Sequence, residues 1–157
     1  MLTLNFAVLL IARTCLVAMF PLSALEKIFD WKTCLVQARS SWVPGGAGLL
    51  VCAILVEGLT PACIVFGWHD RFAAFILAGF CAATAVLYHP FWAFPHLLSE
   101  PLGKAREHFW QFVKNFGLVG GLLLVMFASP GGGLLVDPLQ VLHHPFASSY
   151  ADLAAPR

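Results

Sequence analysis

Four long apolar stretches run along the chain and are separated by more polar segments. Each is close to the roughly 20 apolar residues that a helix needs to cross a bilayer. Pro21 is expected to kink the first stretch near its end, and Pro90 to end the third, because proline disfavours helix in the residue before it. The pattern therefore predicts four transmembrane helices, over residues 4–25, 45–66, 71–88 and 108–128.

The connections between these helices differ in length. Only residues 67–70 join the second helix to the third, which predicts an antiparallel hairpin. The long connections, 26–44 and 91–107, must then lie on one side, with the N-terminus and the tail on the other. The first long connection predicts a short helix in the membrane interface, because its apolar residues recur at helical spacing. These residues are Trp31, Leu35, Ala38 and Trp42.

The composition makes the same case for an all-α polytopic membrane protein, an antiparallel four-helix bundle with interfacial segments after helices one and three. Of its 157 residues 60% are apolar and 11% are charged, against about 45–50% and about 25% in soluble domains. We expect a membrane domain over residues 1–128 and a Pro/Gly-rich tail over 129–157, too short for a fifth span. A net charge of +1 excludes nucleic-acid binding through bulk charge.

The basic residues predict an orientation in the membrane. Five Lys and Arg residues fall on the side of the long connections, against Arg71 and Arg157 on the other. Since cytoplasmic loops carry an excess of Lys and Arg, we expect the long connections in the cytoplasm. Both termini would then lie outside, in a multi-pass protein of a bacterial-type inner membrane.

The cysteines and histidines predict no metal site. No two of the five cysteines are three residues apart, and none has metal-ligand spacing with a histidine. Cysteines within apolar runs behave as small hydrophobes, which leaves Cys34 and Cys63 as the plausible reactive thiols.

Two ionisable residues fall near the middle of predicted spans, where a charge is costly. Arg13 in the first helix and Glu57 in the second occupy similar depths on neighbouring antiparallel helices. We therefore expect a buried ion pair between them. The pair would either fix helix packing or line a ligand or proton site, and both interpretations stay open.

A second polar group is expected at the interface of the long connections. Helix one ends there, helix three ends there and helix four starts there, so their polar residues should converge on one pocket. We expect the segment around Trp92 and Phe94 to roof it, and an anionic substrate to fit in it. The candidate residues are Lys27, His89, Trp92, Lys114 and Asn115.

These residues carry a resemblance. The sequence resembles the DoxX family of small four-helix membrane proteins from about residue 9 to residue 127. The matching pieces are short, but their order and spacing are specific. They are Arg13, the segment 21–31, Glu57-Gly58, Gly67, Arg71, Ala73-Ala74, Ala83-Thr84, His89-Pro90-Phe91-Trp92, Lys114-Asn115 and Gly120-Gly121.

The resemblance implies a membrane subunit of a redox system, linked to quinone or to thiol and sulfur chemistry. Quinone is then the expected ligand, held without a covalent bond, and electrons would come from a partner subunit or a diffusible substrate. Three functions stay open at this point: such a subunit with its own polar site, a purely structural or assembly subunit, and a small weak-acid transporter. The sequence does not decide whether the protein is itself an enzyme.

Overall fold

The computed structural model describes residues 2–40, 43–94, 103–128 and 137–150. These ranges contain helices and no strand. The elements are α1 (Leu2–Val17), α2 (Met19–Phe29), α3 (Trp31–Arg39), α4 (Gly46–Phe66), α5 (Asp70–Tyr88), the 3-10 helix η1 (Phe91–Ala93), α6 (Lys104–Met126) and α7 (Pro138–His143).

Four helical segments are long and apolar enough to cross a membrane. They are Phe6–Phe29, Gly46–Phe66, Asp70–Ala93 and Lys104–Met126. This confirms the all-α fold with four transmembrane helices.

The first span is broken into α1 and α2 at Ala18. Pro21 lies three residues later, in the first turn of α2. A proline has no N–H to donate and its ring clashes with the carbonyl four residues earlier, here that of Val17. The kink therefore falls about one turn before the proline and not at the end of the helix.

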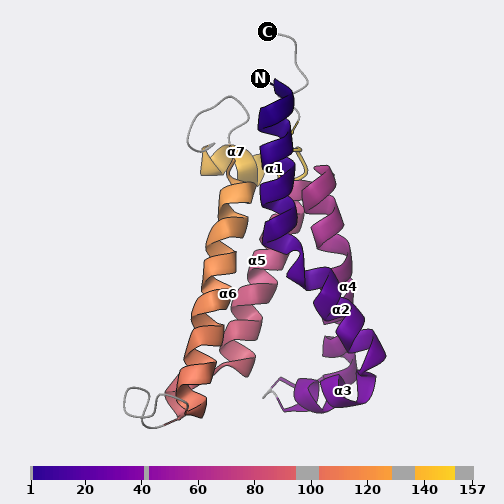
Figure 1. Ribbon diagram of the computed structural model, residues 1–157, viewed down its shortest axis with the longest axis vertical. Helices are drawn as coiled ribbons and strands as arrows, with labels where there is room; N and C mark the ends of the chain where they lie inside the picture. The colour runs from indigo at the N-terminus through magenta and orange to yellow at the C-terminus, as the bar shows by residue number, and fades with distance from the viewer. Residues whose placement is uncertain (1, 41–42, 95–102, 129–136, 151–157) are drawn as a thin grey trace.

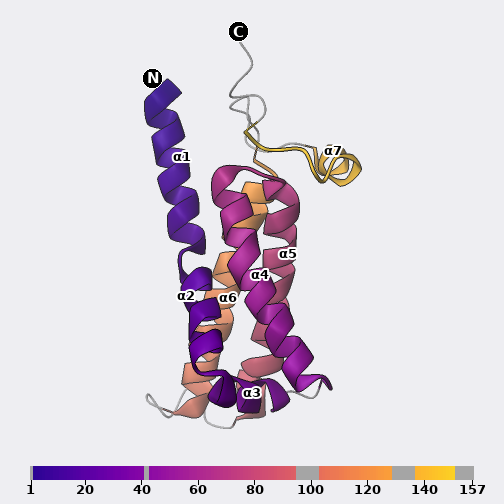
Figure 2. The same cartoon turned by 90° about the vertical axis from the view of Figure 1, so that its right-hand side faces the viewer.

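The elements divide between two ends of the bundle. The α4–α5 turn, α7 and the start of α1 lie at the upper end in Figure 1, and α3 and the start of α6 lie at the lower end. α5 packs against both α4 and α6, and α2 packs against α4. Ile64, Leu77 and Leu122 are fully buried among these helices. Figure 2 shows that α1 extends beyond the upper ends of the other spans.

Helix α3 lies across the lower end of the bundle (Figure 2). Its Trp31 and Leu35 are half-buried and Ala38 is buried, whereas Val36 is exposed. The apolar stripe predicted for this connection thus faces the bundle, although Trp42 lies outside the described residues.

The described part of the tail folds back onto the upper end. Helix α7 begins where Asp137 accepts a hydrogen bond from the Leu139 amide at 3.0 Å, and its Val141 is buried. Beyond it, the Phe146 carbonyl lies 2.9 Å from Nδ1 of His69. The segment 137–150 is therefore part of the packed structure.

Candidate functional site: two ion pairs and a cavity

The first ion pair joins Arg13 of α1 to Asp70, the first residue of α5. Nη1 of Arg13 lies 2.6 Å from Oδ2 of Asp70, and the side chains are 2% and 0% exposed. The same nitrogen donates to the Ile64 carbonyl at 2.9 Å. That carbonyl belongs to the last turn of α4, where backbone carbonyls have no hydrogen-bond partner within the helix. Asp70 in turn lies at a helix N-terminus, where the helix dipole favours a carboxylate.

The tail completes this pair. The Ser149 amide donates to Oδ1 of Asp70 at 3.0 Å, and its hydroxyl bonds both Asp70 and Arg13. The Tyr150 ring stacks on the Arg13 guanidinium, and Cζ of Arg13 lies 4.2 Å from the centre of the ring. The hydroxyl of Tyr150 donates to the Val65 carbonyl. Arg13, Asp70, Ser149 and Tyr150 form what we call the tail cluster.

Close packing explains one glycine of the α4–α5 turn. Gly67 has a left-handed backbone with φ of 73°, and a Cβ there would lie 1.8 Å from the Tyr150 ring. Only glycine suits both conditions.

The predicted ion pair between Arg13 and Glu57 is wrong. Because α1 starts above the other spans, Arg13 lies level with the end of the α4–α5 hairpin and not at mid-depth (Figure 2). Depth counted along the sequence assumed that all four helices begin in one plane. Asp70 was the carboxylate at the correct level.

The second ion pair joins Glu57 of α4 to Lys27 of α2. Nζ of Lys27 lies 2.8 Å from Oε2 and 3.1 Å from Oε1 of Glu57, and 2.5 Å from Oγ of Ser23. Side chains on a helix lean toward its N-terminus, so Lys27 reaches from the lower end of α2 back into the bundle. The Lys27 side chain is 21% exposed and that of Glu57 is 6% exposed.

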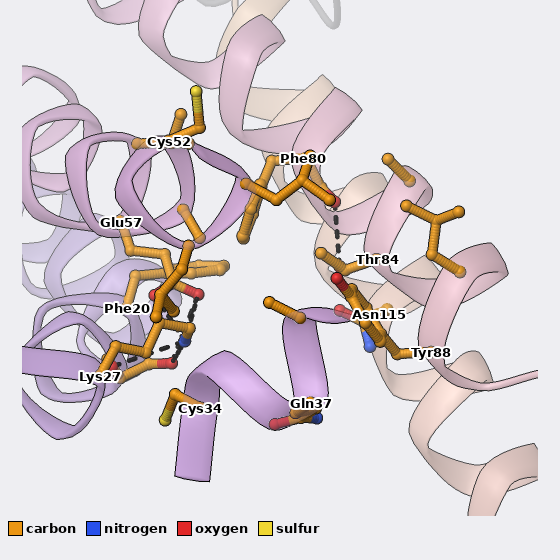
Figure 3. Close-up of a pocket in the computed structure, with 18 of the residues that line it drawn as sticks. Phe20, Lys27, Cys34, Gln37, Cys52, Glu57, Phe80, Thr84, Tyr88 and Asn115 are labelled. Atoms are coloured by element: carbon orange, nitrogen blue, oxygen red, sulfur yellow. Dashed lines mark hydrogen bonds and ion pairs between the residues drawn. The ribbon is translucent and has the colours of Figure 1, made fainter. Parts of the chain in front are cut away.

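This second pair faces a cavity of about 370 Å³ between the helices (Figure 3). Ser23, Lys27 and Glu57 line one side, and α3 contributes Cys34 and Gln37 at the lower end. The rest of the wall is mostly apolar. Its apolar members include Phe20, Leu50, Val56, Phe80, Leu87 and Leu118.

The opposite wall comes from α5 and α6. His89, Lys114 and Asn115 line it, together with Thr84 and Tyr88. The structure thus brings four of the five predicted pocket residues to one cavity, which also takes in Glu57. Among the described residues Lys114 has no carboxylate partner, since the ion pairs there are those of Arg13 and Lys27.

Trp92 does not line the cavity, and the predicted roof is therefore wrong. Its side chain is 57% exposed and packs edge-on against Phe91 and Phe112. Phe94 stacks instead on His108, with ring centres 4.9 Å apart. These aromatics therefore pack on α6 and on one another, and α3 lines this end of the cavity.

Several residues of these sites were missed from the sequence. Ser149 and Tyr150 lie far along the chain from Arg13, and no local pattern marks them. Asp70 carried a signal, because an acidic residue directly before an apolar helix is typical of a helix start. Ser23 lies four residues before Lys27 on the same helix face, which also indicated a shared site.

The thiols are unpaired in the described chain. Cys34 lines the cavity, and burial together with the Asp30 carboxylate raises the pKa of its thiol. A raised pKa lowers the fraction of thiolate, which is the reactive form of cysteine. In the same described ranges, no three His, Cys, Asp or Glu side chains group so as to hold a metal ion.

Arg71 has a structural role at the upper end of the bundle. Its guanidinium donates to the Met126 and Ala128 carbonyls at 2.9 Å each. It therefore caps the C-terminal end of α6, where backbone carbonyls lack helical partners.

Comparison with known proteins identifies the family. No curated protein and no solved structure matches the chain. The DoxX family model matches residues 8–90, a range that includes Arg13, Lys27, Glu57, Asp70 and His89. Lys114 and Asn115 lie beyond the matched range, as does the tail cluster's Ser149. Since the match covers more than half of the 157 residues, this multi-pass membrane protein belongs to the DoxX family.

Proposed function

We propose that the protein is a membrane subunit of a quinone-linked or thiol/sulfur-related oxidoreductase system, in which it holds the quinone head group. A partner subunit would supply the electrons. The observation that carries this proposal is the cavity in which the Lys27–Glu57 pair faces apolar walls within the membrane-spanning part of the fold.

The size and the chemistry of the cavity support a small amphipathic ligand. Its volume of about 370 Å³ lies within the range of roughly 300–1,000 Å³ that is usual for small-molecule sites. Apolar walls accommodate a ring and part of an isoprenoid tail. The polar groups offer an ammonium donor and a carboxylate that can exchange a proton.

The energetic cost of the Lys27–Glu57 pair also favours a binding role. Ion pairs within a membrane protein are expensive, and an apolar pair of similar volume often packs as well. Unlike the tail cluster, Lys27 and Glu57 are not enclosed by further protein groups, because both line the cavity. Charges that are kept at such a place mark a functional site more often than a packing contact.

The position of the cavity favours binding over transport. Its lining runs from α3 at the lower end up to residues such as Glu57 and Leu118. Between it and the upper end lie the fully buried Ile64, Leu77 and Leu122, and then the tail cluster. A weak-acid path would have to cross both layers. The purely structural subunit remains the alternative that the experiment below tests.

We further propose that the long-connection end faces the cytoplasm of a bacterial-type inner membrane. Lys27, Lys32, Arg39, Lys104 and Arg106 lie toward this end, in agreement with the positive-inside rule. Both termini and α7 would then lie on the outer side.

The proposal can be tested with the native thiols as reporters. Cys34 lines the cavity, whereas Cys15 is exposed on α1 and does not line it. Two variants that keep one of these cysteines each, in nanodiscs, are labelled with a lipophilic maleimide at about pH 8.5, close to the pKa of a free thiol. A fully substituted ubiquinone analogue, which has no free ring position for thiol addition, is the ligand.

We expect the quinone to slow labelling of Cys34 in a saturable manner and to leave labelling of Cys15 unchanged. The same tail without the quinone ring serves as a ligand control and should protect neither. Equal protection of both cysteines, or of neither, would contradict quinone binding in the cavity and favour the structural subunit.

A further inference from the structure

Two polar groups lie on opposite sides of the cavity (Figure 3). On one side Lys27 and Glu57 come from α2 and α4; on the other, Tyr88 and Asn115 come from α5 and α6. Apolar rings, those of Phe20 and Phe80, belong to the walls between them. A ligand that fills the space therefore meets polar groups at two ends and apolar surface along its sides.

The first side can donate a hydrogen bond to a ligand. An ammonium has three N–H groups, and Lys27 bonds both carboxylate oxygens of Glu57, at 2.8 and 3.1 Å, and Oγ of Ser23, with a weaker fourth contact to the Ser23 carbonyl at 3.5 Å. The nitrogen lines the cavity and its side chain is partly exposed there. A ligand oxygen can replace the 3.1 Å contact to Oε1, and the 2.8 Å contact to Oε2 then keeps the ion pair intact.

The second side has donors of its own. The Asn115 amide uses one N–H for the Gln111 carbonyl at 2.9 Å, which leaves its second N–H. The Tyr88 hydroxyl has no hydrogen-bond partner among the described residues. Thr84, by contrast, already donates to the Phe80 and Cys81 carbonyls. Tyr88 and Asn115 can therefore donate to a ligand on this side, where Lys114 and His89 also line the wall.

We propose that the cavity selects a ring with hydrogen-bond acceptors at its two opposite ends, which is the geometry of a para-quinone. One ring oxygen accepts from Lys27 and the other from the Tyr88 hydroxyl, beside Asn115. This inference rests on the proposed quinone function and adds the isomer that binds and the two ends that hold it. An ortho-quinone, whose oxygens are adjacent, meets donors on one side only.

The two-ended arrangement predicts which ligands are sensitive to which side chain. Removal of one neutral hydrogen bond weakens binding about five- to tenfold. Tyr88→Phe should therefore lower the affinity for a para-quinone by this factor. It should not weaken binding of a ring with a single carbonyl, because a charged donor, Lys27 or Lys114, holds that carbonyl more strongly than the neutral Tyr88 hydroxyl does.

The experiment measures dissociation constants in nanodiscs for three head groups with the same decyl tail: a para-quinone, its ortho isomer and a cyclohexenone with one carbonyl. The variants are Tyr88→Phe and the double variant Lys27→Met/Glu57→Gln. The double variant removes the ion pair as a unit and leaves no unpaired buried charge. Tyr150→Phe, in the tail cluster, is the matched control and should leave all three affinities unchanged.

We expect the wild-type protein to bind the para-quinone most tightly. Tyr88→Phe should lower the affinity for the para-quinone alone, and the double variant should lower the affinity for all three ligands. If the para-quinone binds but Tyr88→Phe leaves its affinity unchanged, or weakens the cyclohexenone equally, two-ended recognition is wrong and the proposed function stands. If none of the quinones binds the wild-type protein, the proposed function itself is wrong.

Discussion

The protein contains two buried ion pairs that differ in what surrounds them. Arg13 and Asp70 are enclosed by the ends of α4 and α5 and by the tail, and their side chains are at most 2% exposed. Lys27 and Glu57 bond only each other and Ser23, and they face a cavity. The Arg13–Asp70 pair therefore has a structural role at the upper end of the bundle. The Lys27–Glu57 pair leaves polar groups open to the cavity.

The difference teaches how a membrane protein can hold charges at two levels. In the tail cluster most of the remaining hydrogen-bonding groups of the pair bond to protein, although the ε nitrogen of Arg13 has no partner among the described residues. Such satisfaction is the condition under which a buried pair becomes tolerable. At Lys27 and Glu57 the protein supplies some of the hydrogen-bond partners, and a ligand in the cavity can supply the others. Four substitutions test this contrast.

The largest effect is expected at Asp70. Asp70→Ala leaves Arg13 buried without its counter-charge and should lower the free energy of unfolding by about 3–5 kcal/mol. Thermal unfolding in detergent or nanodiscs measures the loss. Asp30→Ala, at an exposed carboxylate, is the control and should change stability by less than about 0.5 kcal/mol. A loss at Asp70 no larger than the control would contradict a structural role for the tail cluster.

A smaller loss of stability is expected at Glu57. In Glu57→Ala the Lys27 ammonium can still bond Ser23 and any water in the cavity, so the loss should be about 1–3 kcal/mol. The same thermal unfolding assay applies, with quinone protection of Cys34 as a second readout that should disappear. If Glu57→Ala destabilises the protein as much as Asp70→Ala does, the Lys27–Glu57 pair is as important for stability as the Arg13–Asp70 pair, and the proposed difference between them is wrong.

Ser149 tests the contribution of the tail to the first pair. Ser149→Ala removes the hydroxyl that bonds Arg13 and Asp70 but keeps the amide bond to Asp70. We expect a loss of about 1–2 kcal/mol and unchanged quinone binding. Ser40→Ala, at an exposed hydroxyl, is the matched control. Stability equal to that of the control would show that the tail does not support the pair.

The smallest effect is a pH dependence from Tyr150. Burial raises the pKa of this phenol above its usual 10.0. A raised pKa in the folded state means that its contribution to stability is complete below about pH 10 and is lost as pH rises through the folded pKa. Unfolding midpoints from about pH 8 to about pH 11 should fall more steeply for the wild type than for Tyr150→Phe. Parallel curves would mean that Tyr150 is not buried in the cluster.

Much of the fold followed from the sequence because hydrophobic burial in a bilayer is a local requirement. Each span must itself carry enough apolar residues to cross the membrane, so the four spans, the tight hairpin and the short helix α3 could be predicted. The convergence of Lys27, His89 and Lys114 followed as well, since helix direction alone places those helix ends at one level.

The partners of the charges could not be found in this way. A side chain's depth depends on where its helix starts relative to the others and on its tilt, and the break at Ala18 and the overhang of α1 change both. Arg13 therefore meets Asp70, and Glu57 meets Lys27. The hydrogen bond between Ser149 and Asp70 joins residues 79 positions apart in the sequence, and no helical spacing predicts such a contact.

The sequence by itself determined that this is a four-span membrane protein with too few charges for any other class, because apolar length and composition act segment by segment. Only the tertiary structure decided which acid neutralises which base, that the tail closes one pair, and that a cavity opens beside the other. These depend on interatomic distances of a few ångströms between separate helices, and the free energy of a buried charge changes steeply over such distances.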